Sequence, residues 1–240
     1  MSTICIIPAR GGSKRIPGKN IRLFAGLPMI AHSIRAAQEA GVFDRILVST
    51  DSDEIASVAR QFGAETPFVR PAELAGDFIG TDAVNVHALG WLAEQGEKVG
   101  AFCCVYATAP FLRARFLQRG LELLRQHHAV SALSVATFSG TIFRSLRLNA
   151  EGRIEMFWPE NFPKRSQDFP AAYHDAGQFY WFDAARYLQA PRMIMDGAVP
   201  VIIPRSYVQD IDTPEDWEVA EHMWRVLLAR EAQDFGPVPA

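Results

Sequence analysis

The chain has few cysteines, no long apolar run and no large excess of charge of one sign. Its 240 residues include three cysteines, an odd number, which argues against the disulfide framework of a small secreted protein. No apolar run approaches the roughly 18 residues that a membrane-spanning helix needs. The formal net charge of −3 argues against general attraction to nucleic acid or to acidic membranes. We therefore expect a cytoplasmic protein with neither partner.

The overall composition is that of an ordinary globular protein. Hydrophobic residues make up 49% and charged residues 21% of the chain. These values exclude a disordered, collagen-like or coiled-coil chain. A chain of this length is long enough to bury a full hydrophobic core without disulfides.

Strand-like and helical patterns alternate over the first 135 residues. Short apolar runs at residues 3–8, 45–49 and 101–107, and a weaker one at 65–69, are each followed by a segment with helical spacing of apolar residues. This alternation is typical of βαβ units. It predicts an α/β fold with a doubly wound, mostly parallel, Rossmann-like sheet.

The pattern changes at about residues 136–170, where strand-like segments surround a turn and no strong helix is found. We interpret this stretch as a small β-rich insertion in a single domain that spans residues 1–230, with a flexible tail at 231–240. A strand at 178–182 and a last helix beginning at Thr213 resume the α/β pattern. The insertion has more apolar residues than a small flap can bury, which indicates an interface.

A glycine-rich basic loop, PARGGSKRIPGKN, follows the first strand at residues 8–20. Arg10, Lys14, Arg15 and Lys19 place four positive charges within ten residues. Ligands of open parallel sheets bind beyond the carboxyl ends of the strands, and glycines allow backbone N–H groups to approach phosphate. The spacing fits neither a Walker A motif nor the dinucleotide pattern. The loop therefore predicts a triphosphate site; the alternative is a solvated loop with incidental charges.

Two aspartates, Asp210 and Asp212, flank one residue shortly after a strand-like run. In an extended backbone their side chains point the same way, about 7 Å apart. Two carboxylates beside a triphosphate suit Mg²⁺, which binds one or two carboxylates together with phosphates and waters. The alternative is that Asp212 helps to cap the final helix while Asp210 is a surface charge, and both interpretations can hold for Asp212.

Residues 7–20 (IPARGGSKRIPGKN) resemble the signature of the cytidylyltransferases that activate sialic acids and related nonulosonic acids. Three further stretches agree in order and spacing: Arg70-Pro71 with Asp77 and Thr81, residues 106–112 (YATAPFL), and residues 210–217 (DIDTPEDW). Within that superfamily, residues 165–168 (RSQD) and 173–181 (YHDAGQFYW) resemble the pseudaminic acid cytidylyltransferases. The resemblance covers the chain from about residue 4 to residue 225.

The resemblance implies a nucleotidyltransferase that joins CMP from CTP to the anomeric hydroxyl of a nonulosonic acid, pseudaminic acid above all, and releases pyrophosphate. It implies Mg²⁺ ligation by Asp210 and Asp212, and a homodimer formed through the insertion. Catalytic roles are expected for Arg10, Lys19 and Asp212, with Asp212 as the candidate base. The expected nucleotide contacts are Ala9, Arg10, Gly11, Ser13, Lys19, Asn20, Arg70 and Thr81.

The sugar end of the site is expected among aromatic and polar residues. The candidates are Tyr106, Arg165, Gln167, Asp168, Tyr173, Gln178 and Tyr180. Tyr106 stands where CMP-sialic acid synthetases usually have glutamine, and Ala176 where they usually have asparagine, which argues against N-acetylneuraminate. Arg165 or Lys164 is a candidate for the sugar carboxylate, in the same or a neighbouring subunit. His174 is equally well explained as a structural residue.

Two other functions stay open at this stage. One is the same reaction on another sugar, as a CMP-legionaminate or CMP-N-acetylneuraminate synthetase. The other is a catalytically silent nucleotide-binding module that regulates a partner, although the complete basic loop and aspartate pair argue against it.

Overall fold

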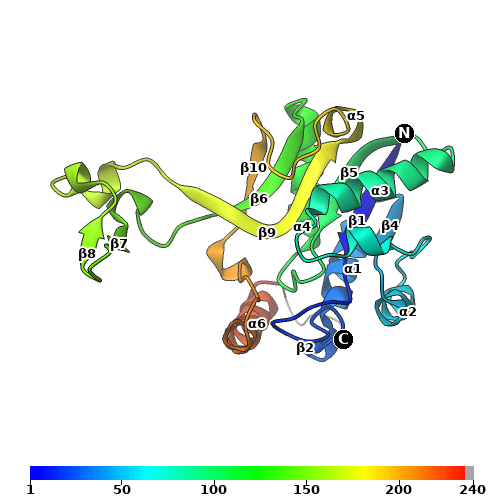
Figure 1. The fold of residues 1–240 in the computed structure, drawn as a ribbon, viewed down its shortest axis with the longest axis horizontal. Helices are drawn as coiled ribbons and strands as arrows, with labels where there is room; N and C mark the ends of the chain where they lie inside the picture. The colour runs from blue at the N-terminus through cyan, green and yellow to red at the C-terminus, as the bar shows by residue number, and fades with distance from the viewer. Residues whose placement is uncertain (236–240) are drawn as a thin grey trace.

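A six-stranded mixed sheet forms the centre of the computed structural model, which describes residues 1–235. Its strand order is β10-β6-β9-β5-β1-β4 (Figure 1). Its members are β1 (Ser2–Pro8), β4 (Arg45–Ser49), β5 (Val99–Val105), β6 (Ser131–Thr137), β9 (Tyr173–Asp183) and β10 (Val199–Ile202). Strand β9 runs antiparallel to both of its neighbours, β5 and β6, while the other pairings are parallel. The mostly parallel α/β sheet expected from the sequence is thus confirmed.

Helices cover both faces of this sheet. They are α1 (Met29–Ala40), α2 (Asp53–Gln61), α3 (Thr81–Glu94), α4 (Ala114–Gln126), α5 (Ala184–Tyr187) and α6 (Pro214–Phe235). Buried residues of α1, α2, α4 and α6 form one core cluster against the sheet, and those of α3 and α5 form the other. The adjacent Cys103 and Cys104 fall in different clusters because neighbouring strand residues point to opposite faces. No helix among residues 1–235 has the length and apolarity to cross a membrane.

Three elements differ in extent from the sequence expectations. The weak strand expected at 65–69 is reduced to one bridge between Leu47 and Glu65, because Pro67 has no N–H to continue the ladder. The strand expected at 178–182 is the longer β9. Helix α6 continues through Phe235, so the tail expected from residue 231 does not begin there, and residues 236–240 lie outside the described residues.

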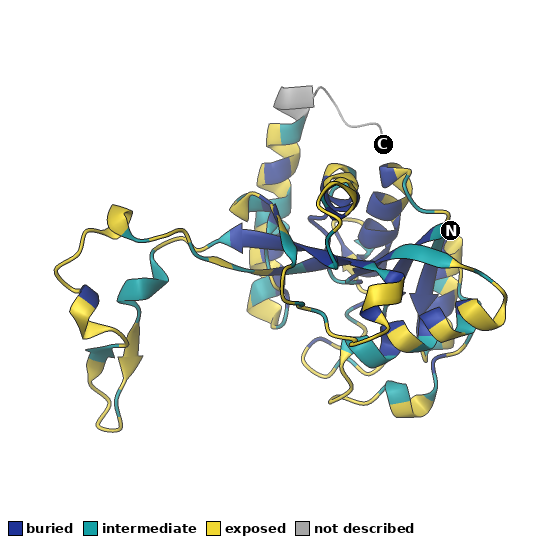
Figure 2. Ribbon diagram, turned by 90° about the horizontal axis from the view of Figure 1, so that it is seen from above, coloured by how far each residue is buried: buried dark blue, intermediate teal, exposed yellow. Residues whose placement is uncertain are grey.

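The expected insertion forms an arm between β6 and β9, at residues 138–172, that projects from the sheet (Figure 1). It holds the hairpin of β7 (Leu146–Leu148) and β8 (Ile154–Met156), with 3₁₀ turns at Ile142–Arg144, Pro159–Asn161 and Ser166–Asp168. Most of the arm is exposed, whereas the sheet is buried (Figure 2). Two minor strands, β2 (Leu23–Phe24) and β3 (Leu27–Pro28), pair in the loop before α1.

Candidate active site

The basic loop begins where β1 ends and is held by hydrogen bonds to the end of β4. The Ala9 N–H donates to the Ser49 carbonyl and the Gly11 N–H donates to the Asp51 carboxylate, each at 2.9 Å. A Cβ atom at residue 11 would lie 3.2 Å from Ser52 Cβ, so glycine permits this approach. Ala9 and Gly11 therefore have their N–H groups occupied within the protein, so they are not free to donate to a ligand in this arrangement.

The interior of the loop is fixed by Asn20 and Ile16. The Asn20 side-chain amide donates to the Arg10 carbonyl at 2.9 Å, and Asn20 is buried. Ile16 is 1% exposed and anchors the middle of the loop in the core. A loop tied at both points holds its cations in a defined arrangement.

These cations line a pocket of about 650 Å³ beyond the carboxyl ends of β1 and β5. Six of the eight expected nucleotide contacts line it: Arg10, Ser13, Lys19, Asn20, Arg70 and Thr81. Two further cations, Lys14 and Arg15, and the sugar candidate Tyr106 line it as well, whereas Ala9 and Gly11 do not. Asp77 forms ion pairs with Arg10, at 2.6 Å, and with Lys14. The pocket is thus strongly cationic and already binds a carboxylate, as an anion site should.

Arg70 and Thr81 also line this pocket. Arg70 is 4% exposed; its Nε donates to the Ser49 hydroxyl at 3.1 Å and a terminal nitrogen donates to the Ser49 carbonyl. Burial lowers the pKa of Arg70, and nearby Asp51 acts in the opposite direction. Thr81 is the first residue of α3, so the positive end of that helix faces the pocket.

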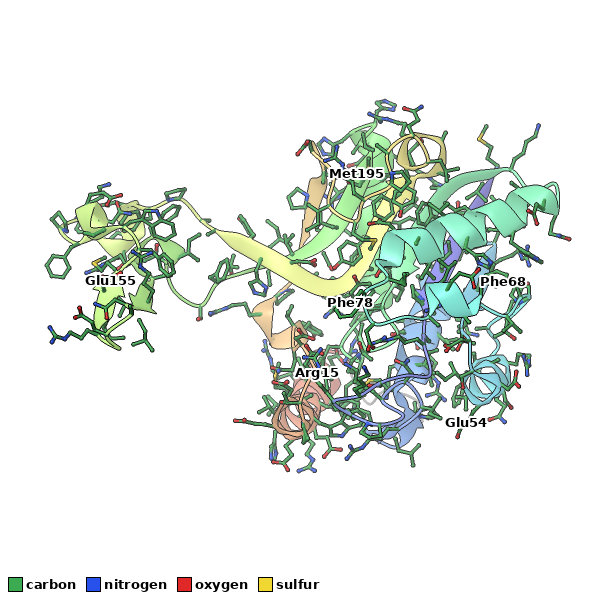
Figure 3. The ribbon with its side chains drawn as sticks, in the orientation of Figure 1. Arg15, Glu54, Phe68, Phe78, Glu155 and Met195 are labelled. Carbon is green, nitrogen blue, oxygen red and sulfur yellow. The ribbon has the colours of Figure 1, made fainter. Side chains whose placement is uncertain are left out.

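The aspartate pair meets the basic loop across the fold. Lys19 Nζ donates to the Ile211 carbonyl at 2.7 Å and lies 3.3 Å from Asp212 Oδ1. Arg15 lies 2.8 Å from Asp212 Oδ2, beside the start of α6 (Figure 3). These contacts join residues almost 200 positions apart and bring the two predicted motifs into one site.

Asp210 differs from Asp212 in its surroundings. Partial burial and the charge of Asp212 raise the pKa of Asp210, while Lys19 acts in the opposite direction. Asp210 has no ion-pair partner among residues 1–235. Asp212 has two such partners, and its N–H donates to Asp216, which also forms a reciprocal cap with Thr213. The expectation that Asp212 serves both the site and the cap of α6 agrees with this geometry.

A second pocket, of about 490 Å³, adjoins the first and shares Tyr106 and Thr108 with it. Asp210 lines this second pocket together with Gln178 and Tyr180. The rings of Tyr106 and Tyr180 lie 5.3 Å apart between centroids. Three of the predicted sugar contacts, Tyr106, Gln178 and Tyr180, therefore lie in the same pocket as Asp210.

A family model described as cytidylyltransferase matches residues 4–214, which is most of the chain. The chain belongs to the cytidylyltransferase family. It is 39% identical over 226 residues to a pseudaminic acid cytidylyltransferase of Campylobacter jejuni, a match that covers 94% of this chain and 97% of the relative. It is 31% identical to a CMP-N,N'-diacetyllegionaminic acid synthase of Legionella pneumophila, with 93% and 96% covered.

The solved structure of CMP:2-keto-3-deoxy-manno-octonic acid synthetase, complexed with CTP, has the same fold. The TM-score is 0.70 at 17% identity, with 95% of this chain and all of the other covered. This cytidylyltransferase is accordingly an enzyme that uses CTP as a nucleotidyl donor. Enzymes of this type generally use a divalent metal.

The remaining sugar candidates of this cytidylyltransferase lie on its arm. Arg165 pairs with Asp168 at 3.0 Å, and both side chains are exposed. Gln167 stands between them in a 3₁₀ turn, and Tyr173 begins β9 at the base of the arm. None of these four lines either pocket. Within one chain the structure separates them from Tyr106, Gln178 and Tyr180.

Two acidic residues of the cytidylyltransferase site lie in stretches that the sequence analysis singled out, but their partners were not predicted. Asp77, in the stretch after Arg70-Pro71, binds the cations of the loop. Asp175, one of the polar residues near the sugar end, accepts a hydrogen bond from the Tyr180 hydroxyl at 2.6 Å. No sequence pattern pointed to either contact.

Proposed function

We propose that this chain is a cytoplasmic pseudaminic acid cytidylyltransferase. It joins CMP from CTP to the anomeric hydroxyl of the sugar acid and releases pyrophosphate. The observation that carries the proposal is that Lys19 of the cationic pocket contacts Asp212, two residues from Asp210 of the adjoining pocket. The identity to relatives with this name, over nearly the whole of both chains, supports the choice of sugar.

The cationic pocket holds the triphosphate and the second pocket holds the sugar acid. In the reaction the anomeric oxygen forms a bond to the α-phosphorus, and the bond between the α- and β-phosphates breaks. Arg10, Lys14 and Lys19 stabilise the negative charge that grows on the phosphate oxygens, because they are fixed before the reaction begins. The hydroxyl proton passes to a carboxylate of the aspartate pair, for which Asp212 is the candidate.

Mg²⁺ is the expected metal, and Asp210 and Asp212 would hold it. Within residues 1–235 no cluster of three acidic, histidine or cysteine side chains could hold a metal alone. Two carboxylates nevertheless fit Mg²⁺, which takes its other ligands from phosphates and water. The raised pKa of Asp210 beside Asp212 fits a pair that a cation would stabilise. When bound, the ion would neutralise phosphate charge.

A homodimer through the arm is part of the proposal. Leu148, Ile154 and Phe162 are each more than 60% exposed on the arm. A two-stranded hairpin cannot bury such residues alone, and a second copy of the same arm offers a matching apolar surface. The dimer would also give the arm residues Arg165, Gln167, Asp168 and Tyr173 a route to the sugar pocket of a neighbouring subunit.

A pyrophosphate-release screen tests the function directly. It crosses four nucleoside triphosphates with pseudaminic, legionaminic and N-acetylneuraminic acids, with and without Mg²⁺. We expect release with CTP and Mg²⁺, fastest with pseudaminic acid. Faster release with another sugar would overturn the choice of substrate. No release with any sugar would favour the silent nucleotide-binding module.

A further inference from the structure

Gln178 presents an unsatisfied hydrogen-bond acceptor at the sugar pocket. The residue is 3% exposed and lines the second pocket. Its side-chain Nε2 donates to the Tyr207 carbonyl. Because a carbonyl oxygen can only accept, this bond fixes which end of the amide faces Tyr207. The other end, Oε1, is buried with no hydrogen-bond partner in the described part of the chain.

Two neighbouring polar residues of this pocket, Tyr180 and His174, also have acceptor atoms, although Thr108 and Gln209 line it as well and can donate. The Tyr180 hydroxyl gives its proton to Asp175, at 2.6 Å, so its oxygen is left as an acceptor beside the Tyr106 hydroxyl. The Gly177 N–H holds the other Asp175 oxygen at 2.8 Å. His174 uses Nδ1–H to reach the Asp175 carbonyl at 2.9 Å, which leaves Nε2 as an acceptor in the neutral ring.

A ligand group that satisfies Gln178 Oε1 must therefore be a hydrogen-bond donor. A buried acceptor without a donor is costly, so Oε1 of Gln178 favours a ligand that brings an N–H or O–H group. Apolar side chains line the same pocket, among them Ala109, Phe111, Ala176 and Val208. An acylamino group combines the two properties, because it has one N–H donor and an apolar methyl.

We propose that Gln178 is a specificity residue whose Oε1 accepts the N–H of an acylamino substituent of the sugar acid. This inference rests on the proposed function, because it assigns the second pocket to the sugar. The Tyr180–Asp175 pair supplies a second acceptor beside it. The name of one relative, the CMP-N,N'-diacetyllegionaminic acid synthase, specifies a diacetyl sugar acid, which carries such groups.

The test compares pairs of substrates that differ in one atom. In each pair, an acetamido group of the nonulosonic acid is replaced by an O-acetyl ester at the same carbon. The ester keeps the methyl and the carbonyl but has no N–H. For the unaltered enzyme we expect kcat/KM to fall about tenfold to a hundredfold for the ester at one acetamido position.

Gln178→Met removes the acceptor while nearly preserving volume. We expect the preference for amide over ester to shrink to within about threefold, with an unchanged KM for CTP. Gln189→Met, at an exposed site on the body, is the matched control and should keep the full preference. The comparison of the two substrates separates this role from a structural one, since misplacement of the pocket would lower both rates alike.

Two results would overturn the inference. They are equal kcat/KM for amide and ester in the unaltered enzyme at every position, or a full amide preference in Gln178→Met, which is what an equal loss on both substrates would give. The first needs no variant, so it decides the matter even if Gln178→Met does not fold. Failure of the proposed function is distinct, because the unaltered enzyme would then release no pyrophosphate with any nonulosonic acid.

Discussion

The body of this cytidylyltransferase, which is the sheet with its helices, buries most of its apolar residues, whereas the arm leaves several of them exposed. In the body, both faces of the sheet are covered, and the β1 residues Ile4 and Ile7 are fully buried in the two clusters. In the arm, Leu148 and Phe162 remain about two-thirds exposed (Figure 2). The body completes its own core and forms both pockets, whereas the arm has strands of three residues and no comparable core. This difference is the basis for the proposal that a second copy of the chain covers the arm.

The largest effect is expected from Asp212→Asn in the body. Loss of one carboxylate from the pair removes a charge at the reacting centre, so kcat should fall about a hundredfold or more. Steady-state kinetics with CTP measure this, and circular dichroism checks the fold. Glu155→Gln on the arm (Figure 3), which also removes one ion-paired carboxylate, is the control and should leave kcat unchanged. Near-normal turnover in Asp212→Asn would contradict the metal and catalytic roles.

A smaller effect is expected when the arm loses its apolar hairpin surface. Leu148 and Ile154 pair across the hairpin. Replacing both by serine should remove about 1.5–3 kcal/mol of favourable burial free energy per side chain from a dimer contact. We expect a dimer to become a monomer by light scattering at micromolar concentration. Leu188→Ser, an exposed leucine of the body, should leave the dimer intact. A monomer before any substitution would refute the assignment.

Gly120→Ala should destabilise the body without affecting the arm. A Cβ atom at residue 120 would lie 2.4 Å from Trp181 Cδ1, in the buried contact between α4 and β9. Overpacking of this kind costs about 1–3 kcal/mol in the free energy of unfolding. Gly140→Ala, in the arm, meets no atom within 4 Å and should change that free energy by less than about 0.5 kcal/mol. Urea unfolding measures both variants, and equal effects would be inconsistent with the packing described.

The smallest effect is a pH dependence of the body from His32. Burial lowers the pKa of His32, and its hydrogen bond to the Phe24 carbonyl opposes this in part. The unfolded chain, with a histidine pKa of about 6.5, then binds more protons than the folded chain as the pH falls. The contribution of His32 to the free energy of unfolding should therefore be fully present above about pH 6.5 and be lost progressively at lower pH.

His32→Gln removes this proton uptake, so urea midpoints measured at pH 7 and pH 5 should differ less in the variant than in the unaltered chain. His222→Gln, on the exposed side of α6, should keep the original difference. An unchanged pH dependence in His32→Gln would assign the effect to other groups.

The sequence predicted the order of strands and helices well where the signal was local. The alternation through β6 identified the parallel part of the sheet, and Thr213 marked the cap of α6. Strand β9 was recognised only in part, and nothing in its composition showed that it runs antiparallel between β5 and β6. Its buried residues satisfy the same pattern in either direction, so the long excursion through the arm decides the orientation.

The site residues show the same limit of sequence-based prediction. The charges of the loop could be predicted, but the partners of residues in the pockets could not. The four cations of the loop were evident from residues 10–19 alone. Their carboxylate partner Asp77 and the unsatisfied oxygen of Gln178 required coordinates, because each depends on what faces it across the fold.

The amino-acid sequence by itself determined the α/β pattern, the cationic loop after the first strand and the pair of aspartates before the last helix. These features follow from side-chain chemistry and from periodicity within short segments. Only the tertiary structure decided that Lys19 meets Asp212, 193 positions away, and that Gln178 lies in the pocket beside them. Such contacts depend on sheet order and crossover paths, which bring distant segments together and which no local pattern specifies.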